Sequence, residues 1–478
     1  MSHTSTETRA RGGAGEKRRR ASFRRSFSIT VAALLILCAA FLGLGYYQGA
    51  KLSSAQVDTK QVVAQSGQQL RLFTNQAIAK VRADQVTITP ATDFTVSSGG
   101  SIIAVQFRDT LHYATKYTVS VRRVTSLYEQ QPSTIRYSFT TAGATLFYLH
   151  RARPNEPQQV DHIYQTGLKG AVDKEVYSAP HIQEFAVFPT ALAVVTLNAD
   201  KTNSLSLVNL SGRAVENVML PTPGGAIDSL QTDATAGVLG FVFTPGGGAD
   251  VHDSSTLMTL NFNLAHTVTP VLGLNGKPAA VLSWLFLPGS TSIVAQTTDQ
   301  SLMLVDALHP AKPTPLGYYS ALNGVSPDGA SLVVGDSLGN NFAYSLASGK
   351  ETPLLPVAID GAVPFGGDLV LIGRGTARVQ KVATYNETTA KYHIPVVYED
   401  GTNSKVLFQS VDGTDSIEGI SVSPNGQYVV VEETLDTAHS VSDGYLRNAR
   451  SRNVATVIVD IATGATVRTL DGFDVNWG

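Results

Sequence analysis

The chain has 478 residues, and its 36 Lys and Arg against 38 Asp and Glu give a formal net charge of −2 at pH 7. Eight basic and two acidic residues lie in residues 1–26, so this segment carries +6 and the rest of the chain −8. The mild acidity of the larger part argues against nucleic acid as a partner, because nucleic-acid-binding proteins present a basic surface. The single cysteine, Cys38, excludes a disulfide framework. The length predicts two or three domains.

Residues 27–47 form a stretch of 21 residues without a charge. Since about 20 apolar residues in a helix cross the hydrocarbon core of a bilayer, this stretch predicts a single transmembrane helix. Basic flanks stay on the cytoplasmic side, so residues 1–26 are expected to be a disordered cytoplasmic tail that attracts anionic membrane lipid. The larger part of the chain would then lie outside the cytoplasm. A cleaved signal peptide is the alternative, although its apolar core is usually about 7–15 residues long.

Residues 48–66 are polar and are expected to form a stalk or linker. Residues 67–141 contain short runs of alternating apolar and polar residues at about ten-residue spacing, which predicts a small β-sandwich. In order, the segment contains VTITP at 86–90, Leu111, Thr115, YTVSV at 117–121 and YSFTT at 137–141. This order is similar to that of bacterial Ig-like domains of envelope proteins. The resemblance implies a spacer or adhesive module and transfers no catalytic residue.

Residues 145–478 contain weak repeats built from short strand-like runs. The clearest copies, residues 324–354 and 420–433, carry the turns Ser326-Pro327-Asp328-Gly329 and Ser423-Pro424-Asn425-Gly426 at the same place. In such a turn proline sets φ, Asp or Asn caps the backbone and glycine takes the left-handed position. The segment resembles the WD40-like β-propellers of the TolB type, whose hallmark is this turn.

Repeats of about 40–50 residues with four strands each are typical of β-propeller blades. Residues 145–478 therefore predict about seven blades, and six or eight also fit the length. Residues 472–477 look like the start of a further blade. We expect them to form the inner strand of the first blade, beside residues 145–150 and 162–166, and so to close the ring without a free edge.

Sequence motifs of known catalytic sites are not supported by their surroundings. Residues 335–339 match G-x-S-x-G, but the nucleophile elbow of α/β-hydrolases needs a strand before it and a helix after it. Here both flanks are strand-like, which predicts a hairpin turn. The ten histidines show no H-x-x-x-H or H-E-x-x-H spacing, and the cluster Asp250, His252 and Asp253 lies in a glycine-rich loop. The sequence therefore predicts no catalytic residue, no cofactor and no metal site.

Two sets of residues are candidates for ligand contact. The segment 434–453 is a long interruption between two strands, and loops of this length are uncommon unless functional or disordered. Its candidates for partner contact, of types common at interaction hot spots, are Tyr445, Arg447, Arg450 and Arg452. A mobile hairpin tip is the alternative. The second set lies on the expected inner strands, facing the central channel, and comprises Glu184, Asp228, Asn323, Asp360 and Glu418.

Together these patterns predict an all-β protein of the cell membrane with a single N-in transmembrane helix, a small Ig-like sandwich and a propeller. The mixture of residue types expected in the channel contains no matched ligand set, which favours binding over catalysis. The expected function is a non-enzymatic module of the cell envelope that binds a protein or glycan partner. A propeller enzyme of a lactonase- or glycan-acting type, with its site in the central channel, is the alternative.

Overall fold

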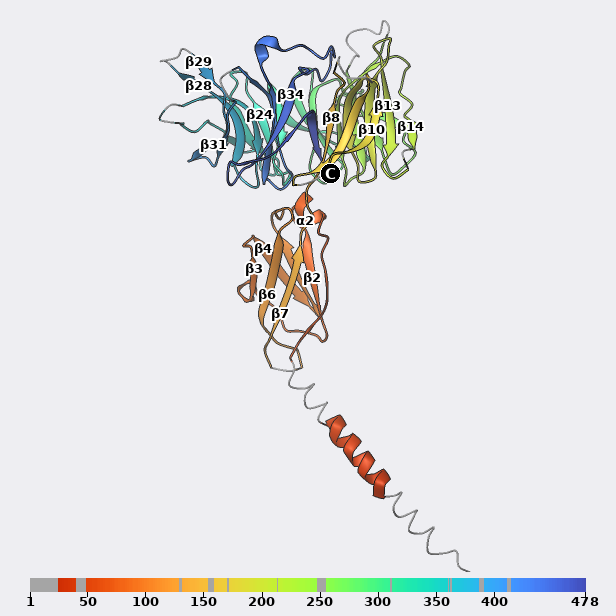
Figure 1. The fold of residues 1–478 in the computed structure, drawn as a ribbon, viewed down its shortest axis with the longest axis vertical. Coiled ribbons are helices and arrows are strands. Elements are labelled where there is room, and N and C mark those ends of the chain that lie inside the picture. Colours follow the sequence, from red (N-terminus) through yellow and green to blue (C-terminus); the bar gives the residue numbers. More distant parts are fainter. Residues whose placement is uncertain are drawn as a thin grey trace, which may run out of the picture. The chain divides into compact units, whose positions relative to one another are not determined.

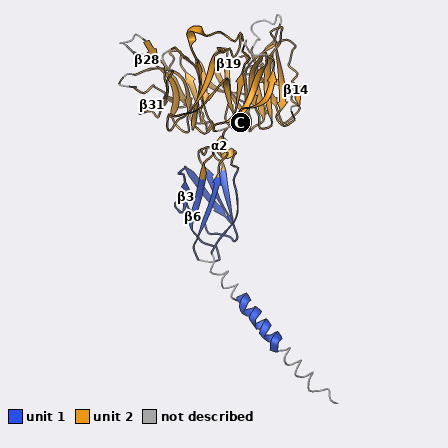
Figure 2. Cartoon of the chain, in the orientation of Figure 1, with its two compact units in different colours: residues 1–57, 69–106, 117–139 blue, residues 58–68, 107–116, 140–478 orange. Residues whose placement is uncertain are grey.

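The computed structural model describes residues 25–39, 49–128, 131–153, 159–169, 172–212, 214–246, 255–309, 312–359, 361, 363–386, 391–410 and 414–478. These residues divide into two compact units, shown in Figure 2. Unit 1 comprises the described residues up to Val57 with residues 69–106 and 117–139, and unit 2 comprises residues 58–68, 107–116 and 140–478. The candidate Asp360 and the cluster at 250–253 lie outside the described residues.

Residues 25–39 of unit 1 form a helix whose apolar side chains are exposed. Among the described residues, no helix is both long enough and apolar enough to cross a bilayer. Residues 40–47, the second part of the predicted transmembrane stretch, lie outside the described residues.

The strands of unit 1 form two sheets, with the orders β1–β2–β5–β4 and β3–β6–β7. Their bounds are β1 (Leu52–Gln56), β2 (Gln69–Thr74), β3 (Val86–Thr89), β4 (Phe94–Gly99), β5 (Ile102–Phe107), β6 (Lys116–Val124) and β7 (Ser133–Thr140), and the 3-10 helix η1 (Ala83–Gln85) precedes β3. Burial alternates along β2, β5 and β6, so each strand turns one face to a core. Because β1 pairs with β2, residues 52–56 belong to a sheet and not to the expected stalk.

The strands of unit 2 form seven sheets from the described residues (Figure 1). We number them as blades 1 to 7 in chain order. Each contains four antiparallel strands in series, and blade 6 carries a fifth short strand. A short helix, α2 (Gln61–Ala64), and the 3-10 helix η3 (Thr437–His439) also belong to this unit.

The blades have the following strands, from the innermost outward. Blade 1 has β36 (Phe473–Trp477), β8 (Thr145–His150), β9 (Asp161–Gly167) and β10 (Lys174–Ala179). Blade 2 has β11 (Ile182–Val187), β12 (Ala191–Leu197), β13 (Asn203–Asn209) and β14 (Val215–Asn217). Blade 3 has β15 (Ala226–Asp233), β16 (Val238–Thr244), β17 (Thr256–Asn261) and β18 (Val268–Pro270). Blade 4 has β19 (Val281–Phe286), β20 (Ser292–Thr297), β21 (Ser301–Asp306) and β22 (Thr314–Tyr318). Blade 5 has β23 (Ala321–Val325), β24 (Ser331–Gly335), β25 (Asn341–Ser345) and β26 (Glu351–Pro353). Blade 6 has β27 (Phe365–Leu371), β28 (Arg378–Asn386), β30 (Val396–Glu399) and β31 (Ser404–Phe408), with β29 (Lys391–His393) beside β28. Blade 7 has β32 (Ser416–Val422), β33 (Tyr428–Thr434), β34 (Val454–Asp460) and β35 (Thr466–Leu470).

The core of unit 2 lies between neighbouring blades. The second strands are buried on both faces and read as nearly continuous apolar runs, for example ALAVVTL in β12 and VLGFVFT in β16. Separate clusters of buried apolar side chains join blade 1 to 2, 2 to 3, and so on to blade 7. Each blade therefore hides its two faces against its neighbours, which is the packing of a β-propeller.

The ring closes as the sequence predicts. β36 pairs antiparallel with β8, so the end of the chain supplies the inner strand of blade 1. β36 also contacts β11, the inner strand of blade 2. Closure removes the free edge that the first and last blades would otherwise expose.

The two faces of the ring differ in the connections they carry. Because strands alternate in direction, the links from second to third strand and from blade to blade lie at one end of the blades. We call this end the upper face, as drawn in Figure 1, and the opposite end the lower face. The predicted turns with Gly329 (φ +68°) and Gly426 (φ +66°) join first to second strands and lie on the lower face.

Short segments at 58–68 and 107–116 cover part of the lower face within unit 2. The side-chain amide of Asn425 donates to the Leu111 carbonyl at 3.1 Å, and the Tyr113 amide donates to Gln427 at 3.0 Å. The Tyr113 ring stacks on Trp477 and Tyr428, with centroids 6.0 and 6.4 Å away. One of the predicted turns thus holds a segment that reaches the closing strand.

Candidate functional site

Each inner strand is irregular near its upper end. The pairing register shifts in β11, β15, β19, β23, β27, β32 and β36. A β-bulge leaves a residue unpaired and redirects its side chain. Of the predicted channel residues, Asn323 and Glu418 are themselves bulged, while Glu184 and Asp228 flank bulges. Contact of these residues with a ligand stays a prediction.

Four carboxylates lie close together on the side of the channel formed by blades 7, 1, 2 and 3. They belong to Glu432, Asp474, Glu184 and Asp228. Glu184 accepts a hydrogen bond from the Leu230 amide at 2.8 Å, and Glu432 accepts one from the Asp474 amide at 2.6 Å. Burial, with a smaller contribution from Asp228, raises the pKa of Glu184 to about 7. Burial and the charges of Glu432 and Glu184 raise the pKa of Asp474 to about 7. Two of the four groups therefore titrate near neutral pH.

The segment 434–453 is attached to this acidic cluster. Arg447 forms an ion pair with Asp228, and the Arg450 side chain donates to Glu432 at 3.1 Å. The side-chain amide of Asn448 donates to the Gln183 carbonyl at 3.0 Å, on the inner strand of blade 2. The long connection of blade 7 therefore reaches blade 2 through the neutral side chain of Asn448 and blade 3 through the charged side chain of Arg447.

A buried arginine holds the same segment against blade 1. Arg151 pairs with Asp443, both nearly inaccessible to solvent, and its guanidinium lies 3.6 Å from the centre of the Tyr445 ring. The Tyr445 hydroxyl donates to Asp161 at 2.8 Å. Burial, followed by the Asp161 carboxylate, raises the pKa of this hydroxyl, so it stays protonated as a donor.

The residues predicted for partner contact thus have contacts within the chain. Tyr445, Arg447 and Arg450 bind Asp161, Asp228 and Glu432, and the Arg452 side chain donates to the Ser442 carbonyl at 3.2 Å. Sequence reasoning missed Arg151, Glu432 and Asp474. No local signal marks them, because their partners lie in other blades.

The other side of the channel holds an open pocket of about 430 Å³ between blades 5, 6 and 7. Its polar lining comprises Asn323, Asn341, Asp336 and Asp368. Asn323 donates to Asn341 at 2.8 Å, and Asp368 pairs with Lys381 at 2.7 Å. Asp336 accepts from the amides of its own hairpin turn, the turn that matches G-x-S-x-G between β24 and β25. The predicted hairpin is confirmed, and the pocket offers amide and carboxylate oxygens to a polar ligand.

Exposed apolar and aromatic side chains gather at the upper face. The set includes Met219, Tyr318, Leu338, Leu355, Val363, Phe365, Tyr385, Tyr392, Ile394, Val441 and Leu446. In the described connections of the lower face, the exposed large apolar side chains are Val172 and Leu264. Single exposed apolar residues are ordinary, whereas contiguous apolar patches are typical of interaction surfaces.

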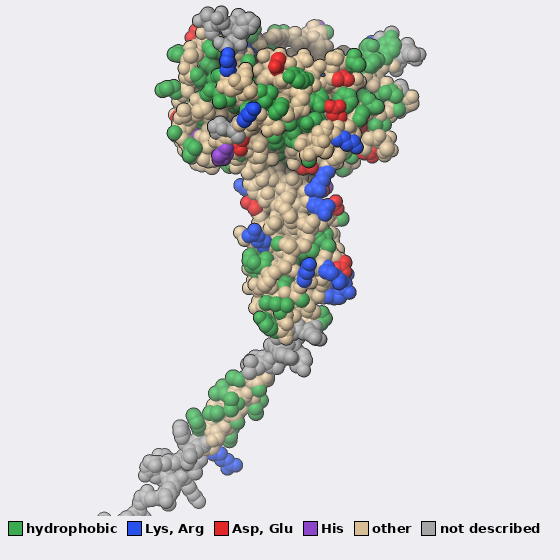
Figure 3. Space-filling view, turned by 180° about the vertical axis from the view of Figure 1, so that it is seen from behind, with side chains coloured by type: hydrophobic (Ala, Val, Ile, Leu, Met, Phe, Trp, Pro, Cys, Tyr) green, Lys and Arg blue, Asp and Glu red, His purple; other side chains and the backbone are tan. Residues whose placement is uncertain are grey.

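The charged side chains of unit 2 form no patch of one sign on the side shown in Figure 3, where Lys and Arg are scattered among Asp and Glu. Within the described residues, no group of three or more His, Cys, Asp or Glu side chains has the arrangement of a metal site.

No family model matches the chain, and no curated protein matches it. Similar solved structures include the β-propeller domain of the Trilobed protease from Pyrococcus furiosus, with 13% identity and a TM-score of 0.44 over 67% of this chain and 91% of that one. An oligogalacturonate lyase in complex with manganese has 10% identity and a TM-score of 0.45 over 83% and 98%. A putative TolB from Agrobacterium tumefaciens has 13% identity and a TM-score of 0.34 over 69% and 91%. These likenesses concern the fold alone, and the chain is a β-propeller protein by the topology of its own sheets.

Proposed function

We propose that this chain is a membrane-anchored β-propeller protein that binds a protein or glycan partner outside the cytoplasm. The uncharged stretch 27–47 behind a basic tail supports the anchor and the orientation. The strand orders β1–β2–β5–β4 and β3–β6–β7 in unit 1 support an Ig-like sandwich, because they match the A-B-E-D and C-F-G sheets of that fold.

The single observation that carries the binding role is the apolar upper face. Protein interfaces are enriched in aromatic residues and depleted of charge at their centre. Phe365, at the start of β27, and the Tyr385–Tyr392 pair, with ring centroids 5.0 Å apart, are exposed there. Their burial by a partner would remove apolar surface from water, at about 25 cal/mol per Å².

We favour binding over catalysis because five of the six channel carboxylates described above are held by groups of the chain, Glu184 among them through the Leu230 amide. Asp336 caps its turn, Asp368 pairs with Lys381, and Asp228 and Glu432 hold arginines of the segment 434–453. Most glycoside hydrolases need two carboxylates free to act as acid and base or nucleophile. We place a glycan partner, if the ligand is one, at the 430 Å³ pocket next to Asn323.

The test compares the two faces in the full-length chain expressed in cells. Proteins cross-linked to the chain are quantified for wild type, Phe365→Asp, Tyr392→Asp and the lower-face control Val172→Asp. We expect at least one partner to be lost about tenfold in both upper-face variants and retained by the control. A parallel sedimentation assay with isolated cell-wall glycan reports the glycan alternative through the variant Asn323→Ala. Equal capture by all variants in both assays would refute the proposed surface.

A further inference from the structure

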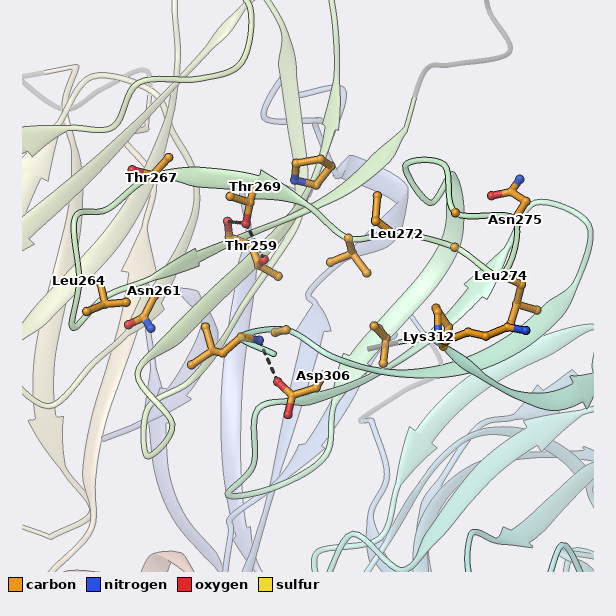
Figure 4. Close-up of a pocket in the computed structure, with 18 of the residues that line it drawn as sticks. Thr259, Asn261, Leu264, Thr267, Thr269, Leu272, Leu274, Asn275, Asp306 and Lys312 are labelled. Carbon is orange, nitrogen blue, oxygen red and sulfur yellow. Dashed lines mark hydrogen bonds between the residues drawn. The ribbon is translucent and has the colours of Figure 1, made fainter. Parts of the chain in front are cut away.

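A second cavity lies on the outer side of the propeller, away from the central channel. It is a groove of about 1010 Å³ between blades 3 and 4, shown in Figure 4. One wall is β17, β18 and the residues 271–276 that follow. The other is the end of β21 with residues 307–308 and 312–313 after it. The volume is at the upper end of the range for small-molecule sites, which is about 300–1,000 Å³.

The walls are mainly apolar. Leu264, Val271, Leu272, Leu274 and Leu308 line the groove. Leu264 is 71% exposed, Leu272 40% and Leu274 38%, so the described residues leave them partly uncovered. In Figure 4, Leu272 and Leu274 lie on one stretch of chain and Leu264 at the far end of the groove. Such a site favours a ligand with a long apolar body.

The edge of β18 is unsuited to an added peptide strand. The Val271 amide donates to the Leu257 carbonyl at 2.9 Å, so the amide of Val271 points toward β17. By alternation, the backbone of residue 270 points outward into the groove. Residue 270 is proline, which has no N–H to donate, and proline at an edge blocks strand pairing. The ligand must therefore contact the side chains of the groove, because it cannot add a strand to the edge of β18 by backbone hydrogen bonds.

Three charged side chains line the groove, and two of them have hydrogen-bond partners within the chain. His266 contacts Glu216 and the Phe262 carbonyl, each at 2.9 Å, with its two ring nitrogens. Asp306 accepts from the amides of Leu308 and His309 at 2.8 and 3.0 Å. Lys312 has no ion-pair partner among the residues that the structure describes. The amides bind the Asp306 carboxylate without cancelling its charge, so Lys312 is the one described cation of the lining that can meet an anionic group, and a single negative charge suits it best.

We propose that this groove binds a single-chain fatty acid, with the carboxylate at Lys312 and the alkyl chain along Leu272, Leu274 and Leu264. A phosphate monoester is less suitable because it carries about −1.5 to −2 charges at pH 7, against one lysine. Lys312 and Leu264 appear at opposite ends of the groove in Figure 4, so head and tail have separate places. The groove reaches the upper face through residues 271–276, but it shares none of the side chains named there for the partner, so its occupancy does not depend on that partner.

The test uses photo-cross-linking of the full-length chain in an unfractionated lysate of expressing cells. A photoactivatable alkynyl fatty acid is added, the sample is irradiated, and labelled peptides are identified by mass spectrometry. We expect label in the peptides that contain residues 264–276 or 305–313. Laurate should compete about fivefold better than methyl laurate, because the ester has no charge for Lys312.

Variants separate the charge from the apolar wall. Lys312→Ala should reduce labelling about fivefold, and Leu272→Asp at least tenfold. Lys277→Ala is the matched control and should leave labelling unchanged. Lys277 is an exposed lysine on the connection that carries Leu272 and Leu274, and it does not line the groove. Label spread over other peptides, equal competition by laurate and methyl laurate, or an equal effect of the two lysine variants would overturn the proposal. Better competition by dodecyl phosphate than by laurate would overturn the assignment of a monoanion.

Discussion

The replacement Glu184→Gln tests the acidic cluster of the channel. Glu184 is buried, and its pKa is raised from 4.5 to about 7, first by burial and then by Asp228. A shift of 2.5 pKa units corresponds to about 3 kcal/mol, at about 1.4 kcal/mol per unit. The folded state holds the proton more tightly than the unfolded state does. This stabilisation is therefore fully present below pH 4.5 and is lost as the pH rises through about 7.

Glutamine is uncharged at every pH, so it does not lose this contribution. Its side-chain oxygen keeps an acceptor for the Leu230 amide, which Glu184 binds at 2.8 Å. We expect Glu184→Gln to leave stability at pH 5 nearly unchanged and to raise it by up to about 3 kcal/mol at pH 8.5. The variant should keep part of the pH dependence of stability that the wild type shows, because Asp474 also titrates near pH 7.

The assay is urea unfolding of the full-length chain at pH 5 and pH 8.5, monitored by tryptophan fluorescence. Trp477 and Trp284 both lie in unit 2, so the signal reports this unit. Glu418→Gln, on the exposed part of inner strand β32, is the matched control and should not change the difference between the two pH values. If Glu184→Gln unfolded with the same pH dependence as the wild type, the reasoning on buried carboxylates would be refuted.

Three further replacements probe the packing of unit 2. Glu399→Ala should lower the free energy of unfolding by about 3–5 kcal/mol, because it leaves the buried guanidinium of Arg378 without its ion pair. The double variant Arg378→Met with Glu399→Leu should recover most of this loss, as measured by urea unfolding. Tyr113→Ala should lower the free energy of unfolding by about 3 kcal/mol, because the aromatic stack under the closing strand is lost. Tyr113→Phe should retain most of the wild-type stability. Equal losses in the two variants would contradict the stacking argument. Asp443→Ala leaves Arg151 buried without its ion pair. Amide hydrogen exchange in residues 437–453 should therefore speed up at least tenfold, while exchange in β12 stays as in the wild type. Unchanged exchange in residues 437–453 would show that other contacts hold the segment.

The fold of unit 2 could be predicted from local patterns. The apolar runs of β12 and β33 indicate strands buried on both faces, and the turns at 326–329 and 423–426 mark the ends of inner strands. The spare strand at the end of the chain predicted closure of the ring, and β36 confirms it. These features depend on residues within a few positions of one another, so sequence order is enough to read them.

The expected stalk shows where such reading failed. Residues 52–56, LSSAQ, have no alternating apolar pattern, but they pair with β2 through the backbone, and backbone pairing requires no such pattern. The sequence did not predict the bulges of the inner strands either. They depend on how each inner strand meets its partner, and they decide that Asp368 and Asp474 leave the ladder, each together with one neighbouring residue.

What the sequence determined by itself was the class of secondary structure, the repeat and its closure, because side-chain periodicity and turn chemistry act over short distances. The tertiary structure alone decided which charges meet. Arg151 and Asp443 are 292 positions apart along the chain, and the pKa values of Glu184 and Asp474 rise because blades from both ends of unit 2 bury them together. Burial and the separation of charges are properties of the packed ring, so no local pattern of residues encodes them.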